Sequence, residues 1–310
     1  MKYYLYPALL ILLVVILVTA LPVIVNFTEN SLVGLEIPKN SSSVAGIQKY
    51  NFPPVSKNIS VPQISARAVL VKDLTTSTIL FQKDASLSLP IASTTKIMTA
   101  LVASEYFKPN SPLTVKSGAN ISGSRVGLVS GEDLSFRSLL YGMLLNSGND
   151  AAYTLAENYP GGVIGFISTM NKKAAMLNLQ NTHFDNPAGF DSPAHFSSAK
   201  DLANITEEAL KDPNLARIFA TKETNIVSLD KKYIHSLVNL NKLLSQVKGV
   251  LGVKTGYTAE AKENLVTYVE RDGHQILTVV LGSDDRFGES TKLIEWVYSN
   301  FTWPGSEILH

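Results

Sequence analysis

Residues 90–100 read Pro90-Ile-Ala-Ser-Thr-Thr-Lys-Ile-Met-Thr-Ala100. From Lys96 to Glu105, good helix formers carry apolar residues three and four positions apart, which predicts a helix. Three residues is one helical turn, so the amine of Lys96 is expected on the same face as the hydroxyl of Ser93 and within its reach. Ser93 would open this helix, beside unpaired backbone N–H groups and the positive end of the helix dipole.

This spacing points to nucleophilic chemistry. A serine needs a base to become a nucleophile, and a desolvated lysine with a lowered pKa can serve as that base. We therefore interpret Ser93 as a nucleophile and Lys96 as its general base. The Ser-x-x-Lys spacing recurs at Ser197–Lys200, Ser228–Lys231 and Ser245–Lys248. No clear turn precedes the first of these, and the other two lie in polar stretches, so local context favours Ser93.

A second motif, Ser147-Gly-Asn149, lies in a tight break between two apolar segments, 134–145 and 151–157, that read as helices. Such a break is expected to expose its side chains, and Asp150 is expected to cap the second helix. Read locally, the motif is equally well a helix end followed by a helix start.

A third motif, Lys254-Thr-Gly256, ends a predicted strand at 250–254. Gly256 has no β-carbon, so a substrate backbone is expected to pair along the strand edge there. Lys254 and Thr255 would hold a carboxylate by charge and by hydroxyl. The local alternative is an ordinary strand end before the Tyr257-Thr258 turn.

The remaining periodicity predicts the fold class. Strands are expected at 66–72, 78–82, 265–270 and 275–281, and a further helix at 291–300. Asp272-Gly273 between the last two strands is a strong hairpin signal. Strands near both chain ends around a helical middle predict an α+β fold with one antiparallel sheet flanked by helices. We assign the catalytic domain to residues 62–310.

The N-terminal segment indicates where in the cell the protein is located. No charged residue occurs from Tyr3 to Phe27, a length that spans about 37 Å as a helix and is enough to cross a bilayer. Lys2 favours an N-terminus inside the cell and a domain outside the cytoplasm. Residues 1–27 are thus expected to form a single-pass transmembrane helix in the cell membrane. A signal peptide cleaved near Ala20, which would release a secreted domain, is the alternative.

Residues 28–61 hold Asn40-Ser-Ser-Ser43 and several prolines and show no sustained periodicity. We expect an extracytoplasmic linker, or in part an extended arm that packs on the domain.

Composition excludes other classes. Lys+Arg number 27 and Asp+Glu 26, so no net field favours a nucleic-acid partner. The chain has no cysteine, which excludes disulfides and thiolate metal sites, and its five histidines show no metal-binding spacing. No cofactor or metal is expected.

Six segments together resemble, in order, the D-alanyl-D-alanine carboxypeptidase family of low-molecular-mass penicillin-binding proteins, which are serine peptidases with these three motifs. The segments are residues 90–100, 139–152, 186–190, 195–203, 249–258 and 279–282. The resemblance covers about residues 64–300. It implies a β-lactamase/transpeptidase-like fold.

The resemblance also implies roles. Ser93 would attack the carbonyl between the two terminal D-alanines of a peptidoglycan stem peptide, with Lys96 as general base. Ser147 would pass a proton to the leaving amine, and Lys254 would polarise Ser147 and help bind the terminal carboxylate. The substrate-binding residues would be Asn149, Lys254, Thr255, Gly256, Tyr257 and Arg286, with the N–H groups of Ser93 and Tyr257 forming an oxyanion hole. For Arg286, a surface salt bridge is the alternative.

The sequence also departs from its relatives. No Glu-x-x-x-Asn motif occurs between Ser147 and Lys254, so the deacylating glutamate of class A β-lactamases has no counterpart. β-Lactam antibiotics are therefore expected to be covalent inhibitors. Lys262 stands where relatives commonly have glycine. The chain ends at His310, so the N-terminal helix is expected to replace the C-terminal anchor of many relatives. A DD-endopeptidase, a β-lactamase and a non-catalytic cell-wall-binding domain remain as alternatives.

Overall fold

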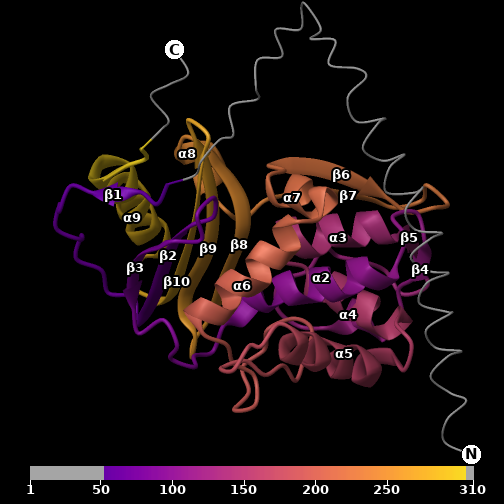
Figure 1. Ribbon diagram of the computed structural model, residues 1–310. Coiled ribbons are helices and arrows are strands. Elements are labelled where there is room, and N and C mark those ends of the chain that lie inside the picture. Colours follow the sequence, from indigo (N-terminus) through magenta and orange to yellow (C-terminus); the bar gives the residue numbers. More distant parts are fainter. Residues whose placement is uncertain (1–51, 305–310) are drawn as a thin grey trace, which may run out of the picture. The chain divides into compact units, whose positions relative to one another are not determined.

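The computed structural model describes residues 52–304 of the chain. Its centre is a five-stranded antiparallel sheet in the order β3-β2-β10-β9-β8 (Figure 1). These strands are β2 (Ala68–Asp73), β3 (Ile79–Lys83), β8 (Val250–Thr258), β9 (Lys262–Arg271) and β10 (His274–Ser283). The predicted α+β class with an antiparallel sheet is confirmed.

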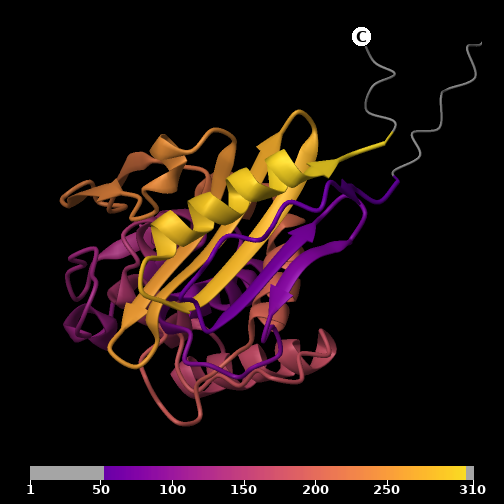
Figure 2. The same ribbon diagram turned by 90° about the vertical axis from the view of Figure 1, so that its left-hand side faces the viewer.

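Helices cover both faces of the sheet. One face carries α9, as Figure 2 shows from that side, and the other carries α2 and α6 within a larger helical layer. The helices are α2 (Lys96–Tyr106), α3 (Phe136–Leu145), α4 (Asn149–Asn158), α5 (Gly162–Met176), α6 (Ala199–Leu210), α7 (Pro213–Phe219), α8 (Leu243–Gln246) and α9 (Arg286–Asn300), with 3₁₀ turns η1 (Ala92–Thr95) and η2 (Ser117–Asn120).

Three strand pairs lie outside the main sheet in the described residues. They are β1 (Val55–Ser56) with β11 (Phe301–Thr302), β4 (Pro112–Thr114) with β5 (Asp133–Ser135), and β6 (Glu223–Val227) with β7 (Ile234–Val238).

The covered faces explain why the buried parts of the central strands are mostly apolar. On β2, Val69 packs in one cluster with Trp296 of α9, whereas Leu70 packs in the larger core with the helices on the opposite face. Successive strand residues point to opposite faces, so a strand covered on both sides needs an unbroken apolar run. The sheet therefore lies between two packed apolar layers.

The turn between β9 and β10 follows its sequence signal. Asp272 and Gly273 both have positive φ, 52° and 78°, as a type I′ hairpin turn requires. The motif Lys254-Thr-Gly256 lies inside β8, not at a strand end as predicted, because β8 stays paired with β9 as far as Thr258 and Lys262. Since β8 is the last strand in the sheet order, its other edge has no strand partner among residues 52–304.

Two predicted helix starts were wrong in detail. Helix α3 begins at Phe136 because the hydroxyl of Ser135 accepts a hydrogen bond from the N–H of Ser138, at 3.1 Å. Asp150 does not cap α4, since that helix begins at Asn149. Its carboxylate accepts hydrogen bonds from the N–H of Ala151 in the first turn of α4 and from three backbone N–H groups in the preceding loop, those of Val126, Gly127 and Leu128.

Part of the predicted linker lies on the domain. Val55 pairs with Thr302, and the indole of Trp296 donates a hydrogen bond to the carbonyl of Ile59 at 2.9 Å. The predicted membrane segment 1–27 lies outside the described residues. Within residues 52–304, every helix is too short or too polar to span a bilayer.

Candidate active site

The predicted nucleophile lies in a 3₁₀ turn, not in the α-helix itself. Ser93 belongs to η1, and α2 begins at Lys96. The hydroxyls of Thr94 and Thr95 donate hydrogen bonds to the carbonyls of Ile91 and Ala92, at 2.7 and 2.8 Å. These hydrogen bonds stabilise the turn, so Ser93 is held at the start of the helix.

Lys96 is fully buried at the centre of the site. Its Nζ lies 2.9 Å from Ser93 Oγ, 2.8 Å from Asn149 Oδ1 and 2.7 Å from the carbonyl oxygen of Ala188. Burial holds the pKa of Lys96 well below the ordinary lysine value, and the charge of Lys254 lowers it further, against a smaller opposite effect of Asp150. These effects favour the neutral amine.

The three oxygens have different proton roles. The carbonyl oxygen of Ala188 and the amide oxygen of Asn149 can only accept hydrogen bonds. A neutral amine has two N–H groups and one lone pair, so both N–H groups are used by these two acceptors. The lone pair is left for the third neighbour, and the O–H of Ser93 can donate to it. The arrangement therefore directs the basic electron pair of Lys96 at the proton of Ser93.

The orientation of Asn149 is fixed by its second contact. Its Nδ2 donates to the carbonyl of Ser122 at 2.8 Å, which leaves Oδ1 facing Lys96. The backbone N–H of Asn149 donates to the carbonyl of Ser124, also at 2.8 Å. Together with the Asp150 contacts, these bonds hold the loop at 122–128 on the start of α4.

Ser147 lies between α3 and α4 in a left-handed conformation, with φ of 58°. The prediction that this break exposes its side chains was wrong, because Ser147 and Asn149 are both buried. The side-chain and backbone contacts of Asn149 place the loop at 122–124 beside the break. Within the described chain, no hydrogen bond of the Ser147 hydroxyl is found.

The third motif presents a buried cation. Burial lowers the pKa of Lys254 to about 7, with a further contribution from the charge of Arg286. Its Nζ donates a hydrogen bond to the carbonyl of Thr255 at 3.1 Å, and Thr255 is itself buried. An amine with a pKa near 7 gains a proton readily when an anion binds beside it, because the anion favours the charged form.

Gly256 also allows a close contact inside the domain, and its predicted pairing with a substrate backbone stays a prediction. A β-carbon at this position would lie 3.0 Å from the carbonyl oxygen of Ile91 and 3.1 Å from the backbone nitrogen of Ser93. The missing side chain therefore lets β8 pack directly against the nucleophile turn.

Arg286 and Tyr257 lie at the outer end of this motif. Nη1 of Arg286 donates to the carbonyl of Gly256 at 2.8 Å, and its backbone N–H donates to Glu263 at 2.9 Å. The guanidinium is half-buried against the motif, and it forms no ion pair with a carboxylate of residues 52–304. The side chain of Tyr257 is 64% exposed.

The loop at 186–190 has a role that the sequence did not predict. Oδ1 of Asn186 accepts backbone hydrogen bonds from Ala188, Gly189 and Phe190, at 3.2, 2.7 and 3.0 Å. This shapes the loop so that the carbonyl of Ala188 reaches Lys96. The available signal was the Asn-Pro-Ala-Gly sequence, in which an asparagine side chain can hydrogen-bond following backbone groups.

The other Ser-x-x-Lys pairs are structural or exposed. Ser197 is buried and hydrogen-bonded to Thr182, and the hydroxyl of Ser228 donates to Asp230 within a turn. Ser245 is exposed on α8. Among the four pairs, Ser93–Lys96 is the pair that meets both other motifs.

Gly189 offers a test of this packing. Its φ is +93°, and a β-carbon there would lie 1.9 Å from the carbonyl oxygen of Ala92. Gly131 has a similar φ of +85° with no atom within 4 Å of such a β-carbon. Gly131→Ala should therefore cost only the backbone strain, about 1–2 kcal/mol of unfolding free energy. Gly189→Ala adds a backbone clash and should cost at least about 3 kcal/mol. Equal losses in urea unfolding would contradict the close packing.

Comparisons with known proteins identify the family of this chain. The model of the peptidase S11 family, D-alanyl-D-alanine carboxypeptidase, matches residues 55–285. The D-alanyl-D-alanine carboxypeptidase DacF of Bacillus subtilis is 33% identical over 84% of this chain and 71% of its own length. A D-alanyl-D-alanine endopeptidase of Pseudomonas aeruginosa is 31% identical over 87% of this chain and 89% of its own.

A solved structure has a similar fold. The Streptomyces K15 DD-transpeptidase superimposes with a TM-score of 0.73 at 32% identity, over 78% of this chain and all of that one. The chain belongs to the D-alanyl-D-alanine carboxypeptidase family of serine peptidases.

Proposed function

We propose that the chain is a serine-type D-Ala-D-Ala carboxypeptidase that removes the terminal D-alanine from peptidoglycan stem peptides. One observation carries the proposal: the amine of Lys96 is buried between two acceptor-only oxygens and the hydroxyl of Ser93. A neutral lysine amine in that setting can act as the base that takes the proton of the serine hydroxyl.

The reaction begins with attack by Ser93. Its proton passes to the lone pair of Lys96 as Oγ bonds to the carbonyl carbon between the two D-alanines. The backbone N–H groups of Ser93 and Tyr257 are proposed to bind the oxyanion, in keeping with the approach of Gly256 to the Ser93 nitrogen. Acylation should fall as the pH drops through the pKa of Lys96, because protonation occupies the lone pair.

Departure of D-alanine needs a proton and an anchored carboxylate. We assign the proton transfer to Ser147, whose hydroxyl is held near the site without a fixed partner in residues 52–304. Lys254 and Thr255 supply the charge and hydroxyl for the terminal carboxylate, and Arg286 adds a second cation beside Gly256. Water then hydrolyses the Ser93 ester. A β-lactam would form the same ester and be held as a covalent inhibitor.

A DD-endopeptidase is the second candidate, because the Pseudomonas aeruginosa relative carries that name. Both reactions share the acyl-enzyme and differ in the amine that leaves. A carboxypeptidase releases free D-alanine, whereas an endopeptidase releases a peptide from a cross-link.

Ser93→Ala tests the nucleophile. The variant should lose release of D-alanine from a peptide ending in Lys-D-Ala-D-Ala, by about 10⁴-fold or to background, because no acyl-enzyme can form. Ser245→Ala is the matched control, since Ser245 also precedes a lysine by three residues but is exposed. It should release D-alanine at the wild-type rate.

Two outcomes would change the assignment. Equal release by Ser93→Ala and wild type would refute the proposed nucleophile. Ser93-dependent cleavage of cross-linked dimers, without release of D-alanine from the linear peptide, would favour the endopeptidase. A penicillin adduct lost within seconds would instead favour a β-lactamase.

We further propose that residues 1–27 anchor the chain in the cell membrane with the domain outside the cytoplasm. The support is the uncharged stretch from Tyr3 to Phe27, which is long enough to span a bilayer. Residues 28–61 would join the anchor to the domain. The intact chain should stay with sedimented membranes in alkaline carbonate. Its release as a full-length soluble protein would contradict an anchor, and a shortened soluble form would indicate cleavage.

A further inference from the structure

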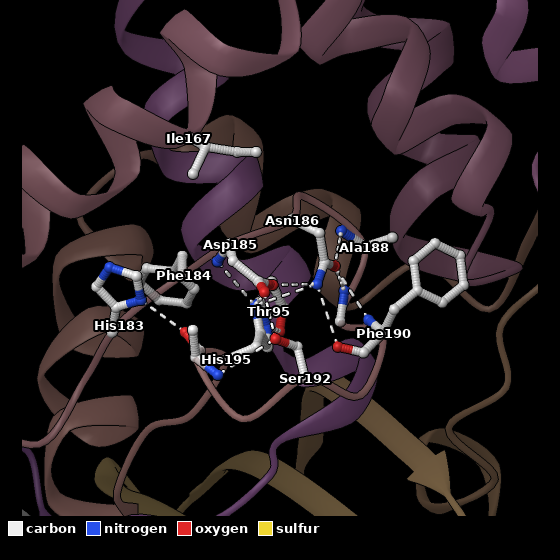
Figure 3. A network of polar contacts seen from close by, with 12 residues as sticks. Thr95, Ile167, His183, Phe184, Asp185, Asn186, Ala188, Phe190, Ser192 and His195 are labelled. Atoms are coloured by element: carbon white, nitrogen blue, oxygen red, sulfur yellow. Dashed lines mark hydrogen bonds and ion pairs between the residues drawn. The ribbon is translucent and has the colours of Figure 1, made fainter.

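A buried histidine joins the two segments that meet at Lys96. His195 is 2% exposed, and Figure 3 shows it between the nucleophile turn and the loop at 185–190. Its Nε2 lies 2.7 Å from the hydroxyl of Thr95. Its Nδ1 lies 3.2 Å from the backbone nitrogen of Asp185 and 3.3 Å from Nδ2 of Asn186. The mechanism above uses none of these contacts.

The surrounding bonds select one form of the imidazole. The hydroxyl of Thr95 donates its proton to the carbonyl of Ala92, so it can only accept from His195. Nε2 therefore carries the hydrogen. The backbone N–H of Asp185 points at Nδ1, which must accept. His195 is thus the neutral Nε2–H tautomer, with a donor to one segment and an acceptor for the other.

The charged neighbours of His195 do not change this neutral tautomer. Oδ1 of Asp185 lies 3.2 Å from Nδ1, and the charges of Asp191 and His183 also act on the ring. Burial outweighs the two carboxylates and lowers the pKa of His195 to about 4. The contact with Asp185 is therefore not an ion pair near neutral pH. Asp185 accepts instead from Ser192 and Asn186.

Asp185, His195 and Thr95 have the composition of a hydrolytic triad, but they cannot act as one. Thr95 is fully buried, and its proton is committed to the carbonyl of Ala92. The ring must therefore act through its neighbours and not on substrate.

Both branches of the network end at the catalytic lysine. Through Thr95, His195 supports the turn that holds Ser93. Through Asn186, whose Oδ1 binds the N–H groups of residues 188–190, it supports the carbonyl of Ala188 that accepts from Lys96. We propose that His195 is a positioning residue for acylation, which aligns the Ala188 carbonyl and the Ser93 turn on either side of the Lys96 amine. This inference rests on the proposed function, in which Lys96 is the base.

The test is the rate of Ser93 acylation by a fluorescent penicillin, measured against pH in the full-length chain. His195→Phe removes both polar contacts. It should slow acylation at least about tenfold, because the reacting groups lose their alignment. The acidic limb of the pH profile should move to lower pH, because loosening the Ala188 acceptor removes a hydrogen bond that favours the charged lysine.

His235→Phe is the matched control. His235 is also a largely buried histidine beside a carboxylate, with Nε2 at 2.8 Å from Glu132, but it lies on β7. It should change stability without changing the acylation rate per folded molecule or its pH profile. A purely structural role for His195 predicts this same result for His195→Phe.

Two further variants keep the inference testable if His195→Phe does not fold. Thr95→Val removes the hydroxyl at similar size and should reproduce the slower, shifted profile, whereas Thr95→Ser should restore the wild-type one. If His195→Phe or Thr95→Val is acylated at the wild-type rate with the wild-type pH profile, the inference is overturned. Labelling of the wild-type protein at Ser93 would still support the proposed function. Absence of wild-type labelling at Ser93 would overturn the proposed function and the inference with it.

Discussion

The burial of one amine constrains the rest of the site. Removing a lysine ammonium from water costs free energy, and this cost keeps the pKa of Lys96 well below its ordinary value. The neutral amine is useful only if its lone pair faces Ser93, and this requires two other acceptors for its N–H groups. The chain supplies these acceptors from separate segments, the start of α4 for Asn149 and the loop at 186–190 for Ala188. Ser93 comes from a third segment, the turn before α2.

Close backbone packing keeps these segments in place. Gly256 lets the last strand of the sheet lie against the nucleophile turn, and Gly189 lets the loop approach the carbonyl of Ala92. Because both faces of the sheet are covered by packed helices, β8 is a rigid wall for the turn (Figures 1 and 2). The fold thus determines the chemistry through distances between backbones, with few polar side chains in direct contact with the base.

Much of this could be predicted from sequence because the signals are local. Helical spacing placed Lys96 beside Ser93, and Asp272-Gly273 placed the β9–β10 hairpin. What could not be predicted depends on tertiary contacts. The carbonyl of Ala188 has no side-chain signature, and the burial of Ser147 has no local signal. The three backbone donors that Asp150 finds at Val126, Gly127 and Leu128 belong to a loop distant in the sequence. Gly256 was predicted to open the strand edge to a substrate backbone, and its close contact with the nucleophile turn was not predicted.

The ionisation state of Lys96 tests the account most directly. In protein labelled with ¹³C and ¹⁵N at lysine, the side-chain signal of Lys96 can be assigned by its loss in Lys96→Met and followed against pH. The account predicts a midpoint well below the ordinary lysine value of about 10.4, so that the amine is neutral where the surface lysines are still charged. A Lys96 signal that titrates together with the surface lysines would contradict it.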